Sequence, residues 1–182
     1  MHNPLGAAVM VWGNGKNVRC DLGNTDHGAL FTYVKFTEAA DSVSKRLMFV
    51  LHIALQGCLR GRDVVYGLTA DTGGHIRYLL DLVAASAQDF GVAEIVVATR
   101  LFQGPPGPDY AVPEERISDK VRLVRLPSAA PGYLSKEAMH DEVASFADNL
   151  VAWIGAQARA PDLIHAHYAD AAAVAAIVEA RL

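Results

Sequence analysis

The segment Thr69-Ala-Asp-Thr-Gly-Gly-His-Ile-Arg-Tyr-Leu-Leu80 decides the fold, because a polar turn gives way to a helix within it. Its adjacent glycines, Gly73 and Gly74, precede apolar residues at helical spacing. Those residues are Ile76, Leu79, Leu80, Val83 and Ala87. Backbone without side chains can approach a phosphate or sugar closely, and the first helical N–H groups can then hold an anion. A tight loop without a ligand explains the glycines equally well, because their spacing matches neither a Walker motif nor G-x-G-x-x-G.

The pattern around this segment predicts alternating strands and helices. Leu47–Leu55 is a nearly continuous apolar run, which is typical of a strand that is buried on both faces. Further strands are predicted at Glu94–Thr99, Lys120–Leu126 and Pro161–Ala166, and helices at His75–Gln88, Ser135–Ala158 and Asp170–Leu182. This order predicts an α/β fold, with a Rossmann-like parallel sheet and helices on both of its faces.

Two features of this pattern lead to narrower expectations. Lys120–Leu126 alternates charged and apolar residues, so we expect this strand nearer a sheet edge, with one face in water. Gln56–Thr72 and Leu101–Asp119 are predicted as long loops, and four prolines exclude helix from most of the second.

The first 46 residues form a poorly readable N-terminal extension, whereas residues 47–182 read as one domain. The extension shows no sustained period, although Ala29–Val34 is compatible with a short strand and Thr37–Lys45 with a short helix. Its start lacks the pattern of a signal peptide, and no apolar run approaches the length of a membrane span. We therefore expect a cytoplasmic protein that has no membrane partner.

Composition excludes several classes of function. The formal net charge of −4 argues against a nucleic-acid binder that relies on a basic surface. The two cysteines, Cys20 and Cys58, are far apart in the sequence, which favours a reducing compartment over a disulfide framework. They build no metal-ligand cluster, and we expect no metal site.

Two polar turns are expected to meet at one rim of the sheet. Asp71–His75 follows the first buried strand, and His167–Asp170 follows the last. Because ligands of parallel sheets bind beyond the carboxyl ends of the strands, these turns are the best candidate site.

Four blocks in these regions resemble the sucrose-phosphate synthase and sucrose synthase family of retaining GT-B glycosyltransferases. The blocks are Asp71-Thr-Gly-Gly-His-Ile-Arg-Tyr78, Val121-Arg-Leu-Val-Arg-Leu-Pro127, Tyr133-Leu-Ser-Lys-Glu137 and Pro161-Asp-Leu-Ile-His-Ala-His-Tyr-Ala-Asp170. The resemblance covers Leu47 to Leu182 and implies an incomplete, truncated GT-B N-terminal domain, which is the acceptor side of such an enzyme. Residues 1–46 have no counterpart in it.

The resemblance implies transfer of a hexosyl group from a nucleotide sugar, typically UDP-glucose, to fructose 6-phosphate, giving sucrose 6-phosphate. The diphosphate leaves from the front face, without a metal held by an Asp-x-Asp motif. UDP-glucose is then the donor substrate, and no tightly bound cofactor is implied. In such a reaction the protein chiefly positions its substrates and stabilises the leaving group.

The first block of the resemblance implies backbone contacts at the glycine pair. Gly73 and Gly74 would bring N–H groups to the diphosphate or acceptor. His75 stands where the family usually has a glutamine that touches the acceptor, and it also reads as a solvent-facing residue of the first turn. Gly132 stands where the family usually has a basic residue, so one phosphate contact of the family has no counterpart here.

The remaining blocks supply side chains. Lys136 would lie near the acceptor phosphate, although a simple surface lysine fits as well. His167 is the candidate catalytic residue, and Tyr168 and Asp170 complete the rim motif as substrate-binding residues. Asp170 is equally readable as a helix N-cap, and His167 as a hydrogen-bonded turn residue.

The family continues beyond the matching region with further strands and a donor domain. We therefore expect that the chain is a gene fragment or one piece of a longer enzyme and that alone it has no transferase activity. A partner chain would supply the donor domain or pair with the open Leu163–Ile164 edge. The alternatives are a non-catalytic binding module, a related mannosylfructose-phosphate-type synthase, and a free-standing Rossmann-like nucleotide-binding enzyme. The last lacks its G-x-G-x-x-G motif.

Overall fold

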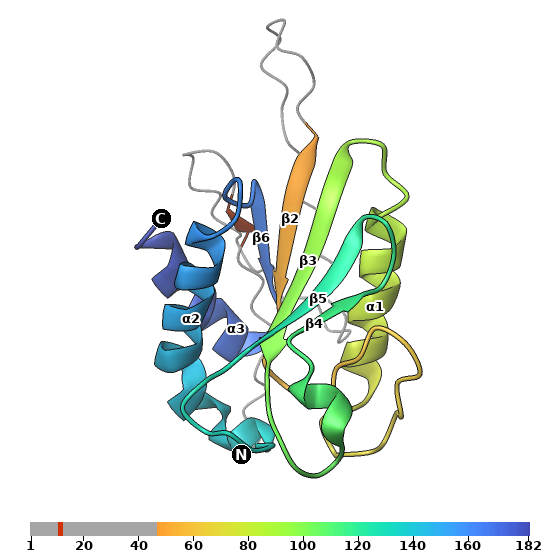
Figure 1. Ribbon diagram of the computed structural model, residues 1–182, viewed down its shortest axis with the longest axis vertical. Helices are drawn as coiled ribbons and strands as arrows, with labels where there is room; N and C mark the ends of the chain where they lie inside the picture. Colours follow the sequence, from red (N-terminus) through yellow and green to blue (C-terminus); the bar gives the residue numbers. More distant parts are fainter. Residues whose placement is uncertain (1–10, 13–46) are drawn as a thin grey trace, which may run out of the picture.

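A computed structural model of the chain describes residues 11–12 and 47–182. One sheet in this part of the chain has the strand order β1-β6-β2-β3-β5-β4 (Figure 1). The strands are β1 (Val11–Trp12), β2 (Met48–Ile53), β3 (Val92–Arg100), β4 (Glu114–Arg116), β5 (Val121–Leu126) and β6 (Leu163–Ala166). The helices are α1 (Gly74–Ser86), α2 (Val143–Gly155) and α3 (Tyr168–Glu179), with 3₁₀ turns η1 (Pro108–Ala111) and η2 (Lys136–Glu142).

The four longer strands run parallel, and the two short ones are antiparallel to their neighbours at the edges. In β2, Val50 pairs with Ile95 of β3 on one side and with Leu163 of β6 on the other. The strand is central, which explains why its sequence is apolar on both faces. The predicted α/β fold with a parallel sheet is confirmed.

Helices cover both faces of this sheet, as predicted. Figure 1 shows α1 on one side and the pair α2 and α3 on the other. Alternate β2 residues divide between two cores, with Val50 packed in the cluster of α1 and Leu51 in the cluster of α2 and α3. The two-residue period of a strand therefore assigns each β2 side chain to one helical layer.

Strand β5 lies next to the edge strand, so the prediction of a position nearer an edge is confirmed, but none of its residues is exposed, so the prediction of one face in water was wrong. The edge is β4, which falls inside the predicted loop Leu101–Asp119. Arg125 of β5 is only 1% exposed, because its guanidinium lies 2.9 Å from Glu115 and donates to the backbone carbonyls of Leu59 and Val112. The alternating pattern alone predicts that the charge of Arg125 faces water. Partners that are distant in the sequence instead allow this charge to be buried.

Helix boundaries also differ from the expectations. The predicted helix at Ser135–Ala158 begins as η2 and becomes α-helical only at Val143. Helix α3 begins at Tyr168 with His167 as its N-cap residue, so Asp170 lies in the first turn and is not the cap. The reading of Asp170 as an N-cap was therefore wrong.

The outer edge of β6 is not open along its whole length. β1 pairs with it, placing Trp12 opposite Ile164 and Val11 opposite His165. The expectation of an unpaired edge is therefore wrong at Ile164. Predicted elements at Ala29–Val34 and Thr37–Lys45 lie outside the described residues. Within the described part of the chain, every helix is too short or too polar to cross a membrane.

Candidate functional site

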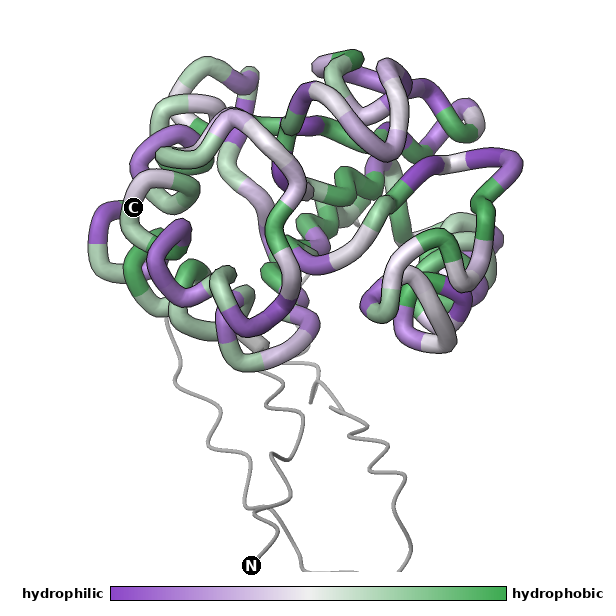
Figure 2. The backbone as a smooth tube through the Cα atoms, turned by 90° about the horizontal axis from the view of Figure 1, so that it is seen from below, coloured by the Kyte–Doolittle hydropathy of each residue, from purple (hydrophilic) through white to green (hydrophobic). Residues whose placement is uncertain are grey.

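The two turns predicted to form a site lie side by side at the carboxyl ends of β2 and β6. The ring of His75 meets the ring of Tyr168 edge-on, with 5.2 Å between centroids, and Tyr78 meets His167 in the same way at 6.3 Å. Figure 2 views the molecule from below, where hydrophilic residues gather on the loops around the hydrophobic strands. Helices α1 and α3 therefore begin next to each other, although their first residues, Gly74 and Tyr168, are 94 positions apart in the sequence. The distance between the His75 and Tyr168 rings is typical of packed aromatic pairs.

The glycine pair at the start of α1 faces open space. A Cβ atom added at Gly73 or Gly74 would meet no heavy atom within 4 Å, and Gly73 has a φ of −139°. The φ of Gly73 is outside the left-handed region, and a side chain would have room at both positions. No side chain caps α1, and no acidic residue lies in its first turn. The absent side chains leave the positive end of the helix accessible.

His75 and Tyr168 form the bridge between the two turns. Nε2 of His75 is buried without a hydrogen-bond partner in the protein, and burial lowers the pKa of this side chain. Tyr168 adopts a φ of +72°, in the left-handed region that side chains other than glycine seldom occupy. Such strained residues cluster at functional sites, so this pair supports the choice of rim.

A polar network fixes the turn that precedes the glycines. Asp71 accepts hydrogen bonds at Oδ1 from Thr69 Oγ1, at 2.6 Å, and from the Tyr133 hydroxyl. Burial, followed by this hydrogen bond, raises the pKa of Tyr133 to about 12. Tyr133 remains a neutral donor at neutral pH, so the loop after β5 stays attached to the turn before α1.

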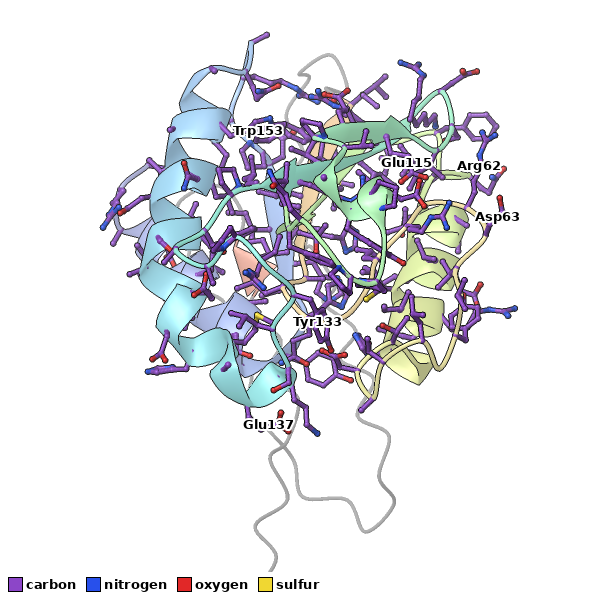
Figure 3. All side chains as sticks on the ribbon, turned by 60° about the horizontal axis from the view of Figure 1, so that its bottom comes forward. Arg62, Asp63, Glu115, Tyr133, Glu137 and Trp153 are labelled. Carbon is purple, nitrogen blue, oxygen red and sulfur yellow. The ribbon has the colours of Figure 1, made fainter. Side chains whose placement is uncertain are left out.

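The remaining predicted residues flank this network. Lys136 is exposed at the first position of η2, next to Glu137, which Figure 3 shows on the same side of the molecule as Tyr133. Asp170 accepts a 2.8 Å hydrogen bond from Nε2 of Gln56, in the loop after β2. The structure therefore brings every predicted residue to this end of the sheet, while their roles stay predictions.

The loop that carries Gly132 is held by Arg100, which is 2% exposed. Its guanidinium donates to the carbonyls of Ala130 and Gly132, at 2.9 and 3.1 Å, and lies 3.6 Å from Glu142. Burial lowers the pKa of Arg100, with the charge of Glu142 acting against it. The buried guanidinium therefore fixes the position of this loop through hydrogen bonds to its carbonyl groups.

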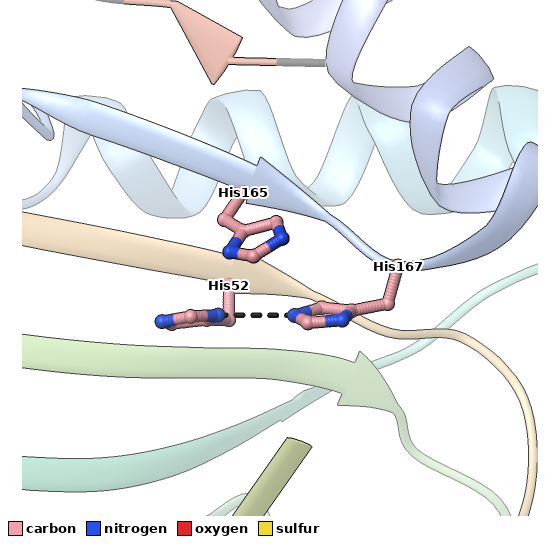
Figure 4. A group of neighbouring side chains, drawn as sticks. All are labelled: His52, His165 and His167. Carbon is pink, nitrogen blue, oxygen red and sulfur yellow. Dashed lines mark hydrogen bonds between the residues drawn. The ribbon is translucent and has the colours of Figure 1, made fainter. Parts of the chain in front are cut away.

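His167 belongs to a cluster of three histidines (Figure 4). His52 Nδ1 lies 3.0 Å from His167 Nε2, a hydrogen bond in which one ring holds the shared proton, and the ring of His165 stacks on that of His167 at 4.4 Å. Burial, reinforced by the charges of His165 and His75, lowers the pKa of His167 to about 3. The candidate catalytic residue is therefore a neutral imidazole that can donate or accept a hydrogen bond.

Sequence reasoning missed His52, His165 and Arg100. His52 lies inside an apolar run, where its side chain is paired by register with His165 of the neighbouring strand. The spacing of His165 and His167 by two residues is a signal for one shared strand face. No local pattern marks Arg100. Its partners lie about 30 to 40 residues away in the sequence, so this buried ion pair joins distant segments of the chain.

No protein-family model matches the chain. The chain is 29% identical over 158 residues to sucrose-phosphate synthase 4 of Arabidopsis thaliana, covering 75% of this chain and 15% of the relative. It is 30% identical over 168 residues to the sucrose-phosphate synthase of Zea mays, covering 78% of this chain and 16% of that enzyme.

A solved structure agrees with these relatives. The sucrose-phosphate synthase of Thermosynechococcus elongatus superposes with a TM-score of 0.57 at 18% identity, over 74% of this chain and 31% of that one. This likeness shows a fold shared with part of a GT-B-like glycosyltransferase. The resemblance to the sucrose-phosphate synthase family is confirmed, and the chain spans about a sixth of the length of the curated relatives that it matches.

Proposed function

Because the chain resembles sucrose-phosphate synthases, we propose that it is the acceptor-side part of a retaining glycosyltransferase of this kind. Its substrate is fructose 6-phosphate, which receives a hexosyl group from a nucleotide sugar, UDP-glucose, to give sucrose 6-phosphate. The observation that carries this proposal is the contact between His75 and Tyr168, because it joins the two turns whose motifs resemble the family.

The site offers separate groups for each part of a phosphorylated sugar. The uncapped start of α1 at Gly73 and Gly74 presents N–H groups to an anion, and the exposed ammonium of Lys136 adds positive charge at the same end of the sheet. The neutral rings of His75 and His167 and the carboxylate of Asp170 can exchange hydrogen bonds with sugar hydroxyls. This combination favours a sugar phosphate over an uncharged sugar.

In the proposed reaction, these residues position the acceptor hydroxyl and keep water from competing for the donor. The family resemblance assigns the nucleotide sugar to a second domain, which we propose is supplied outside the matching region. Effective catalysis would then depend on holding the two substrates in one geometry, which can supply a large part of the acceleration.

A thermal-shift screen tests the acceptor role. A ligand that binds only the folded chain raises its melting temperature with concentration. We expect a shift with fructose 6-phosphate, and smaller or no shifts with fructose, inorganic phosphate, UDP and UDP-glucose. Equal shifts with inorganic phosphate would show that the site binds anions in general and does not recognise the sugar. No shift with any ligand would favour a non-catalytic module.

A further inference from the structure

We propose that His52, His165 and His167 form a binding site for a divalent transition-metal ion such as Zn²⁺. One ligand atom from each of the three side chains lies within 4.8 Å of the others. Among the described residues, this is the group of potential metal ligands that converges in this way. The proposal rests on the cluster itself and does not depend on the proposed sugar-phosphate function.

Strand register places the three rings on one face of the sheet. His52 and His165 are direct partners in the parallel pair β2 and β6, and His167 follows His165 by two residues. Figure 4 shows the three imidazoles near one another, with His52 and His165 on adjacent strands and His167 just beyond the end of β6. Because both backbones are held by the sheet, the cluster is rigid at its base, and only side-chain rotation is needed to adjust it.

The distances are close to those of a tetrahedral site. Two nitrogens bound to one zinc ion lie roughly 3.3 Å apart when each Zn–N bond is about 2.0–2.1 Å. The His52 and His167 nitrogens are 3.0 Å apart, so these two need to separate only slightly. His165 is half-buried, which leaves its ring room to turn toward the other two.

His52 is the most deeply buried of the three histidines. Its side chain is 2% exposed, and its Nε2 atom has no hydrogen-bond partner in the protein. Nδ1 of His52, and not Nε2, faces His167, so an ion shared by these two rings binds His52 through Nδ1.

Chemistry selects the class of ion. Imidazole nitrogens suit Zn²⁺, Ni²⁺, Cu²⁺ and Co²⁺ and not Mg²⁺ or Ca²⁺, which prefer oxygen. A metal binds only the unprotonated imidazole nitrogen, so the affinity should fall at low pH. Three histidines would leave the fourth position of a tetrahedral ion open, toward the rim where His165 and His167 are partly exposed.

Titration of the untagged, chelator-treated chain with Zn²⁺, followed by calorimetry, tests the site. We expect one bound ion per chain and, with Co²⁺ as a probe, the visible absorption of tetrahedral coordination. His52→Leu should weaken binding at least tenfold and abolish the absorption. His140→Ala, at an exposed histidine of η2, is the matched control and should leave both unchanged.

Two results would overturn the site: no binding by the parent chain, or equal affinity in His52→Leu. If His52→Leu does not fold, as judged by circular dichroism, His165→Asn at the half-buried position replaces it, with the same expectation. The fructose 6-phosphate shift, measured in the presence of chelator, separates failure of this site from failure of the proposed function.

Discussion

Tyr133 donates a hydrogen bond from its hydroxyl to Asp71, although the two residues are 62 positions apart. The bond joins the loop after β5 to the turn before α1, so the two sides of the rim depend on each other. Asp71 is 6% exposed, and its Oδ2 atom has no hydrogen-bond partner. Loss of the tyrosine donor would therefore leave this carboxylate with fewer partners in a buried position.

We expect Tyr133→Phe to lower the free energy of unfolding by about 1–2 kcal/mol, because it removes a hydrogen bond to a buried charged group. Urea denaturation measures the change. Tyr66→Phe, at a side chain that is 46% exposed, is the control and should change stability by less than about 0.5 kcal/mol. Equal effects of the two substitutions would show that the Asp71 contact contributes nothing.

Gly74→Ala separates the two explanations of the glycine pair. A methyl group there meets no neighbour, so we expect the free energy of unfolding to stay within about 0.5 kcal/mol of the parent value. If fructose 6-phosphate approaches this backbone, its affinity should fall roughly tenfold, a loss of about 1.4 kcal/mol. Unchanged affinity would mean that the ligand does not approach the glycines.

Gly57→Ala provides the contrast for that experiment. An added Cβ would lie 2.4 Å from the carbonyl oxygen of Asp71, and the backbone φ is +80°. We expect a loss of about 2 kcal/mol or more in unfolding free energy from the clash and the left-handed conformation.

Lys136→Ala tests the charge of the proposed phosphate site. Lys136 is exposed, so its removal should leave the melting temperature nearly unchanged. Loss of a charged contact to phosphate should weaken fructose 6-phosphate binding by roughly tenfold, measured by calorimetry. Lys120→Ala is the matched control, because Lys120 bonds to the carbonyl of Asp89 at the opposite ends of the strands. A similar loss in both variants would point to a general effect of charge.

The buried pair of Arg100 and Glu142 predicts a dependence of stability on pH. Burial raises the pKa of Glu142, but hydrogen bonds from Ser128 and the Ala130 amide, with the charge of Arg100, outweigh it and leave the pKa below its ordinary value of 4.5. A carboxylate with a lowered pKa stabilises the fold above its unfolded pKa, and that contribution is lost as the pH falls through the folded pKa.

Glu142→Gln should therefore be less stable than the parent chain by about 3 kcal/mol at pH 7, since it leaves Arg100 buried without a counter-charge. The gap should narrow below about pH 4, where the parent carboxylate also becomes protonated. Urea denaturation across this range measures both chains. A gap that stays constant down to pH 3 would contradict the prediction.

Cys58 is fully buried, and burial raises the pKa of its thiol. In a Cys20→Ser background, we expect thiol reagents to modify Cys58 slowly in the native chain and rapidly in urea, because the thiolate is the reactive form. Rapid native modification would indicate that the loop after β2 opens often, at a low free-energy cost.

Much of this architecture follows from local patterns. The apolar run of β2 and the glycine turn before α1 predict a parallel sheet, and topology then predicts that the turns around Gly74 and His167 share one rim. The structure agrees, as the contact of His75 with Tyr168 demonstrates. These features succeed because hydrophobic period and strand order are properties of short segments.

The features that escaped prediction depend on distant partners. Strand β4 has three charged residues and therefore no apolar period, yet its Glu115 neutralises the buried Arg125 of β5. The meeting of His52 with His165 depends on the register of β2 against β6, across 113 positions. Neither relationship is encoded within a window of neighbouring residues, so only the assembled sheet reveals them.

The left-handed backbone of Tyr168 couples two things that are separate in most helices. The same φ rotation that sets the angle at which the chain enters α3 also sets where the aromatic ring stands over His75. One residue therefore belongs both to the rim and to the first turn of a helix that packs on the opposite face of the sheet from α1.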